Sequence, residues 1–400
     1  MGTEFTQVAV AWQLYELTES PLQVGLIGLA RVIPLLSLGL FGGLLADAVD
    51  RRRLMMATQI AQCSLSSTLV VASLTGAVTP LLLYLVSGAL ALCTALDSPA
   101  RQSIVPNLIP REHLASGLAL INTQTKLGSV AGPSLAGIAL AFAGPALCYA
   151  VDATSWLTML VALVLVKPST GFRAAGRRLS LKALSEGVGF VAANPVILSA
   201  FVLDCGARLL GNNRALLPAY AKDILNVGAP GLGLMFAATS AGAIVAAAAM
   251  SIVPPIRRMG IWALTGVAVY GTCTAIFAVS HNFGLALLML AGVGAGNSVS
   301  VVLRDTVTQL SSPNDLRGRV ASVGNLFSSS GPQLGQLQSG AVAELVSVPA
   351  AALIGGVATV LFTGVMAILP ALRTFESSMV VGSTPQLPRG ERPQLAELLR

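Results

Sequence analysis

Apolar residues along the chain gather into long runs that short polar segments separate. Each run is close to the 20 or so residues that a helix needs to cross the core of a bilayer, and few charges interrupt it. This pattern predicts membrane helices, because only helices and closed barrels satisfy all of their backbone polar groups in lipid. We expect the spans near 3–18, 22–46, 54–77, 80–98, 116–142, 147–166, 196–218, 231–253, 260–280, 284–303, 320–344 and 348–370.

The first of these predicted spans is too short to cross a bilayer. Glu4 interrupts it, and a polar stretch from Tyr15 to Ser20 follows at once. A complete crossing would need a helix that begins upstream of Met1. The sequence therefore predicts an all-α integral membrane protein with twelve helices, of which the first is truncated.

Composition agrees with a membrane protein and excludes a soluble one. Hydrophobic residues make up 54% of the chain and charged residues 10%, whereas an ordinary soluble domain has about 25% charged residues. The five cysteines lie singly within apolar runs, so their spacing indicates neither disulfide pairing nor metal ligation. We expect no metal and no cofactor.

Basic residues alternate from one side of the predicted membrane to the other. Of the 24 Lys and Arg residues, all but five follow even-numbered spans or lie in the tail; the five are Arg31, Lys126, Arg208, Arg214 and Lys222. Cytoplasmic loops carry such an excess of Lys and Arg, so we expect both termini in the cytoplasm. The net charge of +7 then reflects topology and contact with anionic lipid headgroups, and no nucleic-acid partner is expected.

The longest basic linker divides the spans into two sets of six. This predicts a six-helix bundle over 1–166, a cytoplasmic linker over 167–195, a second six-helix bundle over 196–370 and a disordered cytoplasmic tail over 371–400.

An internal repeat supports the division into halves. The pattern Q-x-x-x-P-N occurs at 102–107 and again at 309–314, and G-P-x-L occurs at 132–135 and again at 331–334. Each pair falls at corresponding places in the two halves, as expected for parallel repeats related by an axis along the membrane normal. A substrate site would then lie between the halves, near the midplane.

The short loop after the second span carries a concentrated set of charges. Gly43 lets two helices approach, Asp47 places a carboxylate at the membrane surface, and Arg51 and Arg52 follow at once. These residues resemble the G-x-L-A-D-x-x-G-R-K/R loop motif of the major facilitator superfamily, although Asp50 stands where that motif has Gly.

The simplest role of the arginines is to set topology, and we expect a gating role in addition. The hypothesis is that Arg51 pairs with Asp97, at the cytoplasmic end of the fourth span, in one of two gate states.

A second motif lies in the fifth predicted span. Gly128, Gly132, Pro133 and Gly137 are similar to the antiporter motif of the same superfamily, in which glycines allow close packing and proline allows a bend. Helix packing with no bearing on transport direction is the alternative interpretation.

Residues 97–102 and 313–320 extend the resemblance to one branch of that superfamily, which contains enterobactin-type siderophore exporters and macrolide or multidrug efflux proteins. The resemblance implies two six-helix bundles that export a small molecule by alternating access and proton antiport. We expect a monomer in a bacterial plasma membrane, with the lipid bilayer, a small-molecule substrate and protons as partners.

Five charged residues fall within the predicted spans: Arg31, Lys126, Asp152, Asp204 and Arg208. A charge at the centre of a membrane helix costs about 2.5 to 3.5 kcal/mol on insertion scales, so each should face a cavity or a partner. They are the best candidates for binding substrate or protons.

These charged residues differ in whether an oppositely charged neighbour lies on the same helix. Asp204 and Arg208 are four residues apart and can pair, either as a structural ion pair or with a role in transport. Asp152 has no basic neighbour on its own helix and could exchange a proton, with structural pairing to Lys126 as the alternative.

The sequence favours a transporter, with a membrane-embedded enzyme as the weaker alternative. A membrane-embedded enzyme would need a nucleophile with a base, a metal set or a nucleotide loop, and the chain has only His113 and His281, far apart in sequence, and no phosphate-loop motif. The sequence thus predicts a secondary transporter for a small amphiphilic molecule of the drug or siderophore class. Import stays open, because alternating access runs in either direction.

Overall fold

The computed structural model describes residues 2–48, 51–108, 111–165, 181–252, 258–313 and 316–369, and nearly all of these lie in helices. The first half of the chain contains α1 (Gly2–Thr18), α2 (Pro21–Ala48), α3 (Arg51–Thr75), α4 (Pro80–Leu108), η1 (Arg111–His113) and α5 (Leu114–Leu165). The second half contains α6 (Leu181–Ala193), α7 (Pro195–Gly211), η3 (Arg214–Leu216), α8 (Leu217–Ala219), η4 (Tyr220–Ile224), α9 (Gly228–Ile252), α10 (Met259–Ala278), α11 (Phe283–Ser311), α12 (Arg317–Leu345) and α13 (Val348–Ile368). The prediction of an all-helical membrane protein is confirmed.

Eight helical segments of the described part are long and apolar enough to cross a membrane. Their outer surface is apolar too: Phe142 is 87% exposed and Ile252 is 83% exposed, which lipid tolerates far better than water does. With 17 residues, α1 spans about 25 Å, less than the roughly 30 Å of a bilayer core. Neither α1 nor α12 is among the eight segments, so the count of twelve crossings stays a prediction.

Helix α5 contains two membrane helices joined by a very tight turn. Gly144 interrupts the helical backbone with φ 71° and ψ −174°, a left-handed conformation that glycine adopts easily, and Pro145 follows. The chain therefore reverses direction within α5, between the predicted spans 116–142 and 147–166.

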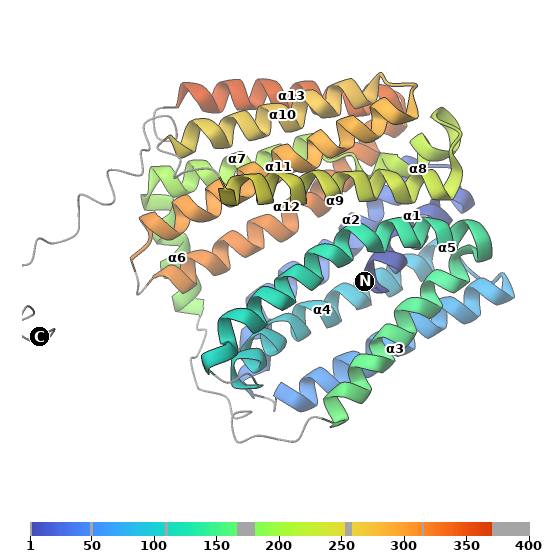
Figure 1. Cartoon of the computed structure of the whole chain (residues 1–400), viewed down its shortest axis with the longest axis horizontal. Helices are drawn as coiled ribbons and strands as arrows, with labels where there is room; N and C mark the ends of the chain where they lie inside the picture. The colour runs from blue at the N-terminus through green and yellow to red at the C-terminus, as the bar shows by residue number, and fades with distance from the viewer. Residues whose placement is uncertain are drawn as a thin grey trace, which may run out of the picture.

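The helices form two groups that meet along a central seam (Figure 1). In the first group α1 and α3 pack against α5, and α2 packs against α4; in the second, α9 and α10 pack against α11, and α13 packs against α10. The groups join where α2 packs against α12 and where α5 packs against α9. The repeated G-P-x-L segments, 132–135 in α5 and 331–334 in α12, thus each lie on a helix that contacts the opposite group.

Glycines allow these two seams to be tight. A Cβ atom on Gly28 of α2 would lie 2.2 Å from the backbone oxygen of Gln333 on α12. A Cβ atom on Gly137 of α5 would lie 2.7 Å from the Cα atom of Gly233 on α9. Helix backbones can approach this closely only where no side chain intervenes, which gives Gly137 a packing role.

The predicted linker includes a helix that the sequence analysis did not place. Helix α6 packs against α12 and α7, and the Gly187 backbone lies close to Arg319. Glu186 and Arg319 form an ion pair between α6 and α12. Asn194 then caps α7 by accepting hydrogen bonds from the backbone N–H groups of Val196 and Ile197. The part of the linker from Leu181 on therefore belongs to the second group.

Candidate transport site

The seventh predicted span, 196–218, lies within one of the eight apolar segments, Pro195–Ile224, but its helix is interrupted. Helix α7 ends at Gly211, Asn212 is extended, and the chain resumes as the short η3, α8 and π-helical η4. The Asn212 side chain replaces part of the lost backbone bonding: Nδ2 donates to the Pro332 oxygen at 2.7 Å, and Oδ1 accepts from the Arg214 N–H at 2.9 Å. Irregular backbone at membrane depth is typical of segments that line a cavity.

Two cavities lie beside this break. The first has a volume of about 720 Å³, counting space open to solvent, and α1, α2, α4, η3, α9 and α12 surround it. The second, of about 980 Å³ on the same measure, lies among residues of η3, α9, α10 and α11 and reaches Glu4 on α1 and Ser129 on α5. Arg214 and Phe236 line both cavities, so the two adjoin at these residues, and we call them together the central space.

Arg214 is held at the junction of the two cavities by an aromatic ring. Its guanidinium lies 5.2 Å from the centroid of the Phe236 ring, within the range of a cation–π contact. The guanidinium of Arg214 is exposed to the cavity. Arg214 belongs to the second half of the chain.

Two of the predicted charges line the central space. Arg31 on α2 faces the first cavity, and Arg208 on α7 faces the second. Arg208 also pairs with Asp204, with 3.1 Å between Nε and Oδ1, as their spacing predicts.

Asp152 lies behind the cavity wall and is 1% exposed. Its Oδ2 atom accepts hydrogen bonds from Thr6 Oγ1 and Ser66 Oγ, both at 2.8 Å. Thr6 lines the first cavity and thus connects the carboxylate to it. The side chain of Lys126 lies outside the described part, so pairing between Asp152 and Lys126 stays a prediction.

Sequence reasoning missed three charged residues of this region. Arg214 and Glu4 line the second cavity, together with Asn213. The run Gly211, Asn212, Asn213 combines residues that favour turns and could have marked the break.

The third missed residue is Arg304, which the sequence analysis assigned to a loop after the tenth span. It lies within α11 and is 7% exposed, because α11 continues to Ser311. Its guanidinium pairs with Asp204 and with Asp305, and it donates to Ser328 Oγ at 2.7 Å. The repeat offers a signal: the offset of 207 that relates Gln102 to Gln309 also relates Asp97 to Arg304.

We call one end of the molecule the basic end. It carries Arg52 at the start of α3, Arg319 at the start of α12 and Arg101 near the end of α4. Asp97 is fully buried there; its Oδ1 accepts from Gln59 Nε2 at 3.2 Å, and its Oδ2 lies 3.1 Å from Arg101 Nη2. Arg52 Nη2 donates to the Leu163 oxygen at 3.1 Å.

Several expected residues of the loop motif lie beyond what the structure describes. Gly43 and Asp47 belong to α2, but the surroundings of Gly43 and the side chains of Asp47 and Arg51 are outside the described part. Pairing of Arg51 with Asp97 therefore stays a prediction, and the described partner of Asp97 is Arg101. In the fifth-span motif, Gly128, Gly132, Pro133 and Gly137 are all buried within α5.

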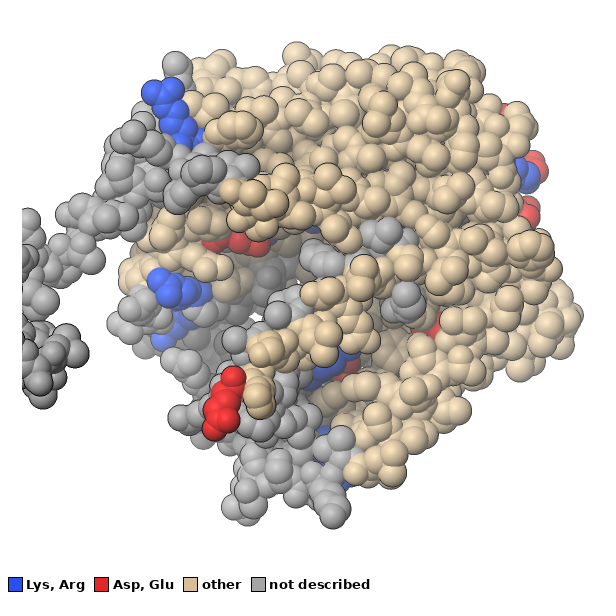
Figure 2. All heavy atoms as spheres, in the orientation of Figure 1, with Lys and Arg blue, Asp and Glu red and all other residues tan. Residues whose placement is uncertain are grey.

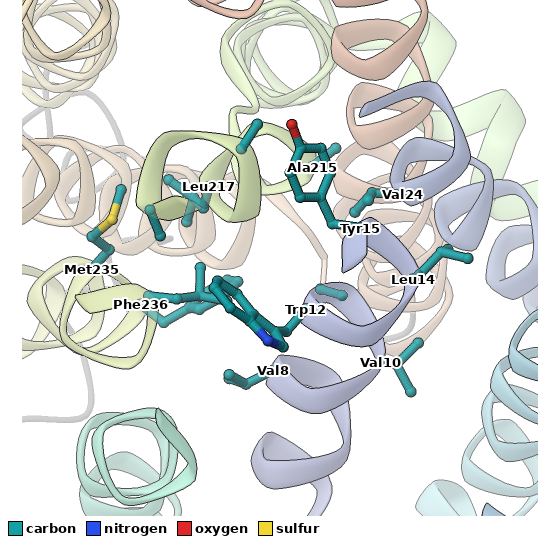
Figure 3. Packing of buried hydrophobic residues seen from close by; sticks show 14 of the residues in the cluster. Val8, Val10, Trp12, Leu14, Tyr15, Val24, Ala215, Leu217, Met235 and Phe236 are labelled. Atoms are coloured by element: carbon teal, nitrogen blue, oxygen red, sulfur yellow. The ribbon is translucent and has the colours of Figure 1, made fainter. Parts of the chain in front are cut away.

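The opposite end, which we call the closed end, joins the two groups by polar contacts. Tyr15 donates its hydroxyl to Asp223, Lys222 Nζ lies 3.1 Å from Glu19 Oε1, and Ser20 Oγ donates to Glu344 Oε2 at 2.8 Å. Beneath them is an apolar cluster in which Trp12 and Tyr15 of α1 face residues such as Leu217 and Phe236 of the second half (Figure 3). The surface is instead hollowed between the groups on the side toward α6 (Figure 2).

Comparison with known proteins agrees with this architecture. A sequence model for the family described as transmembrane secretion effectors, of the major facilitator type, matches residues 1–397. The chain belongs to this family.

Named relatives of the family cover nearly all of the chain. The enterobactin exporter EntS of Salmonella choleraesuis strain SC-B67 is 27% identical over 378 residues, which are 93% of this chain and 89% of the exporter. The multidrug efflux pump Tap of Mycolicibacterium fortuitum is 26% identical over 387 residues, which are 94% of each protein.

Solved structures share the fold. A bacterial homologue of the human lysosomal transporter Spinster, in an inward-facing and unoccupied conformation, gives a TM-score of 0.68 at 17% identity and covers 94% of each chain. The nucleoside transporter NupG gives a TM-score of 0.69 at 13% identity and covers 93% of this chain and 97% of its own. The predicted major facilitator fold is confirmed.

Proposed function

We propose that the protein is a secondary active exporter that moves a small amphiphilic molecule by alternating access and proton antiport. The observation that carries the proposal is the central cavity between the two groups, which is closed at one end by contacts between them and has both charged and apolar walls. Apolar walls with a few charges suit an amphiphile. The names of the two relatives, an enterobactin exporter and a multidrug efflux pump, favour export of such a molecule.

The basic end faces the cytoplasm in this proposal, and so do both termini. Arginines concentrate at that end, and cytoplasmic loops carry such an excess. The hollow between the groups then opens toward the cytoplasm, where an exporter collects its substrate. Transport would require the contacts at the closed end to break and the basic end to close.

Asp152 is the proposed proton-coupling group. It is buried, no basic side chain contacts it among the described residues, and Thr6 links it to the cavity. A carboxyl in such a place can be neutral in one conformation and charged in another, which is the requirement for coupling. Its position beside α1, α3 and α5 lets a change in their packing alter its contacts.

Flux measurements in membrane vesicles of known orientation test the proposed function. The probes are three dansylated alkyl amphiphiles that differ only in their end group, which is a carboxylate, a primary amide or an amine. In everted vesicles acidified inside, at least one probe should accumulate above its level in matched vesicles that lack the protein, which correct for trapping of the amine, and a protonophore should abolish the difference. Gradient-driven accumulation in right-side-out vesicles would show an importer instead, and no accumulation in either would overturn the proposal.

A further inference from the structure

The central cavity contains cationic donors that the described protein leaves without anionic partners. Arg31 comes from α2 in the first half, Arg214 comes from η3 in the second, and both line the first cavity. Among the described residues, no carboxylate forms an ion pair with either guanidinium. The two charges instead repel each other, with only a weaker attraction between Arg31 and Glu4.

Asn213, next to Arg214 in the chain, adds a third donor from the second cavity. It is 5% exposed and lines the second cavity next to Arg214, and its Nδ2 atom is buried without a hydrogen-bond partner in the described part of the chain. A buried donor left without an acceptor is destabilising. The Asn213 amide is therefore available to a ligand that supplies an acceptor.

The other cationic residue of the cavity is balanced. Arg208 has its charge compensated by Asp204 at 3.1 Å, so it adds little net attraction for an anion. Of the other described charges in the central space, the two cations Arg31 and Arg214 outnumber the one anion Glu4, so the space carries a net positive charge. An uncompensated charge within a membrane protein is costly, and an anionic ligand would offset part of that cost.

We infer that Arg31, Arg214 and Asn213 bind the anionic group of the substrate, which makes the substrate an acidic amphiphile. This inference rests on the proposed function, because it takes the central cavity as the substrate site. A carboxylate or phosphate matches the planar fork of each guanidinium. The apolar part of the molecule would lie against Val24, Ile27 and Phe236, which line the same cavity.

The position of the two arginines gives this site a second property. Because they belong to opposite halves, an anion held between them cancels a repulsion across the seam. The acidic group thereby favours the approach of the halves around it, as alternating access requires after substrate binds.

Equilibrium binding to the purified full-length protein in detergent tests the inference. The probe is dansylaminoundecanoic acid, with its primary amide and the matching amine as comparisons, and dansyl fluorescence reports binding. The acid should bind about tenfold more tightly than the amide, a difference of about 1.4 kcal/mol, and the amine should bind most weakly.

Substitutions of the two arginines test whether these side chains cause the preference for the acid over the amide. Arg31→Gln and Arg214→Gln should each remove most of the preference for the acid while the affinity for the amide stays within about twofold; Arg31→Lys should keep much of it. Arg317→Gln removes one positive charge from an exposed position outside the cavity and is the matched control, with no expected change. Affinity for the amide also reports that each variant is folded.

The anion could be a soluble acid or a lipid headgroup, and competition separates these sources. Displacement of the probe by a short-chain phosphatidylglycerol at lower concentrations than by octanoate identifies a lipid, and the reverse order identifies a soluble acid. Equal binding of acid and amide by the unaltered protein, or no binding of the acid, overturns the inference. Binding in detergent needs no gradient, so this result is independent of whether export is observed in vesicles.

Discussion

Arg304 on α11 forms an ion pair with Asp204 on α7, and the two side chains are 7% and 3% exposed. Asp204 also pairs with Arg208, so one buried carboxylate contacts two guanidinium groups. Removing the carboxylate would leave Arg208 without its described partner and Arg304 with only the exposed Asp305. We expect Asp204→Asn to lower the free energy of unfolding by about 3 to 5 kcal/mol.

Asp305 is the matched control for this prediction. It contacts the same Arg304 guanidinium, but its side chain is 54% exposed. Asp305→Asn should therefore lower stability by less than about 1 kcal/mol. Denaturant or thermal unfolding in detergent measures both, and equal losses would contradict a central role of Asp204.

Tyr15 is expected to hold the closed end shut. Its hydroxyl bonds Asp223 of the opposite half in a partly buried setting, whereas the Glu19 and Lys222 pair beside it is more exposed, Glu19 at 77%. Tyr15→Phe should increase the population open at this end, and Lys222→Ala should change it much less. Double electron–electron resonance between spin labels at Thr79 and His281 measures this opening, because the two positions lie in loops of opposite halves at the closed end. Tyr15→Phe should show longer distances than the unaltered protein.

Gly28 is expected to tolerate no side chain at the seam of α2 and α12. In Gly28→Ala the new methyl would overlap the Gln333 backbone oxygen, which lies 2.2 Å from the Cβ position, so the helices must separate. Transport should fall and the melting temperature should drop. Gly364→Ala in α13 meets nothing within 4 Å and should be neutral or stabilise by about 0.5 to 1 kcal/mol. Similar losses in both variants would point to general helix effects.

Asp152→Asn should uncouple transport from protons while the protein stays folded. The amide oxygen can still accept hydrogen bonds from Thr6 and Ser66, so packing is preserved while the titrating group is lost. In proteoliposomes, uphill flux driven by a pH gradient should disappear, and downhill exchange of the probe should remain. Undiminished uphill flux would refute the assignment of Asp152.

Asp97→Asn tests the proposed gate at the basic end. Asp97 pairs with Arg101 in this conformation, and we expect it to exchange Arg101 for Arg51 when the basic end closes. The variant should slow transport without impairing membrane insertion, and Arg101→Gln should favour the closed basic end. An unchanged transport rate for Asp97→Asn at normal expression would contradict the gate.

Much of the fold could be predicted because the bilayer imposes a simple rule on the sequence. Apolar runs predicted where most helices begin, although α4 and α11 continue to Leu108 and Ser311, well past the predicted ends at 98 and 303. The repeated G-P-x-L segments lie on α5 and α12, which both contact the opposite group. The break at Asn212 was missed because hydropathy alone does not distinguish a continuous helix from an interrupted one. Arg304 was missed because a charge near the end of an apolar run resembles the start of a loop.

The candidate site was only partly predictable, because the hydropathy pattern reveals charges within apolar runs but not the charges that the fold brings to the cavity. Arg31 and Arg208 were found because a charge in an apolar run is conspicuous, and both line the cavity. Arg214 and Glu4 lie beside polar residues in the sequence, so the pattern gave no hint that the fold brings them to the centre. Which charge has a partner depends on the packing of other helices, as Arg304 and Asp204 show.

Helix α6 packs against α12 and α7, and Glu186 on α6 forms an ion pair with Arg319 on α12. These contacts place α6 in the same rigid unit as the second group, although the sequence assigns it to the linker. When the two groups move relative to each other during transport, α6 should therefore travel with α12. A change that detaches α6 from α12 would alter how the halves are connected without touching any residue of the cavity.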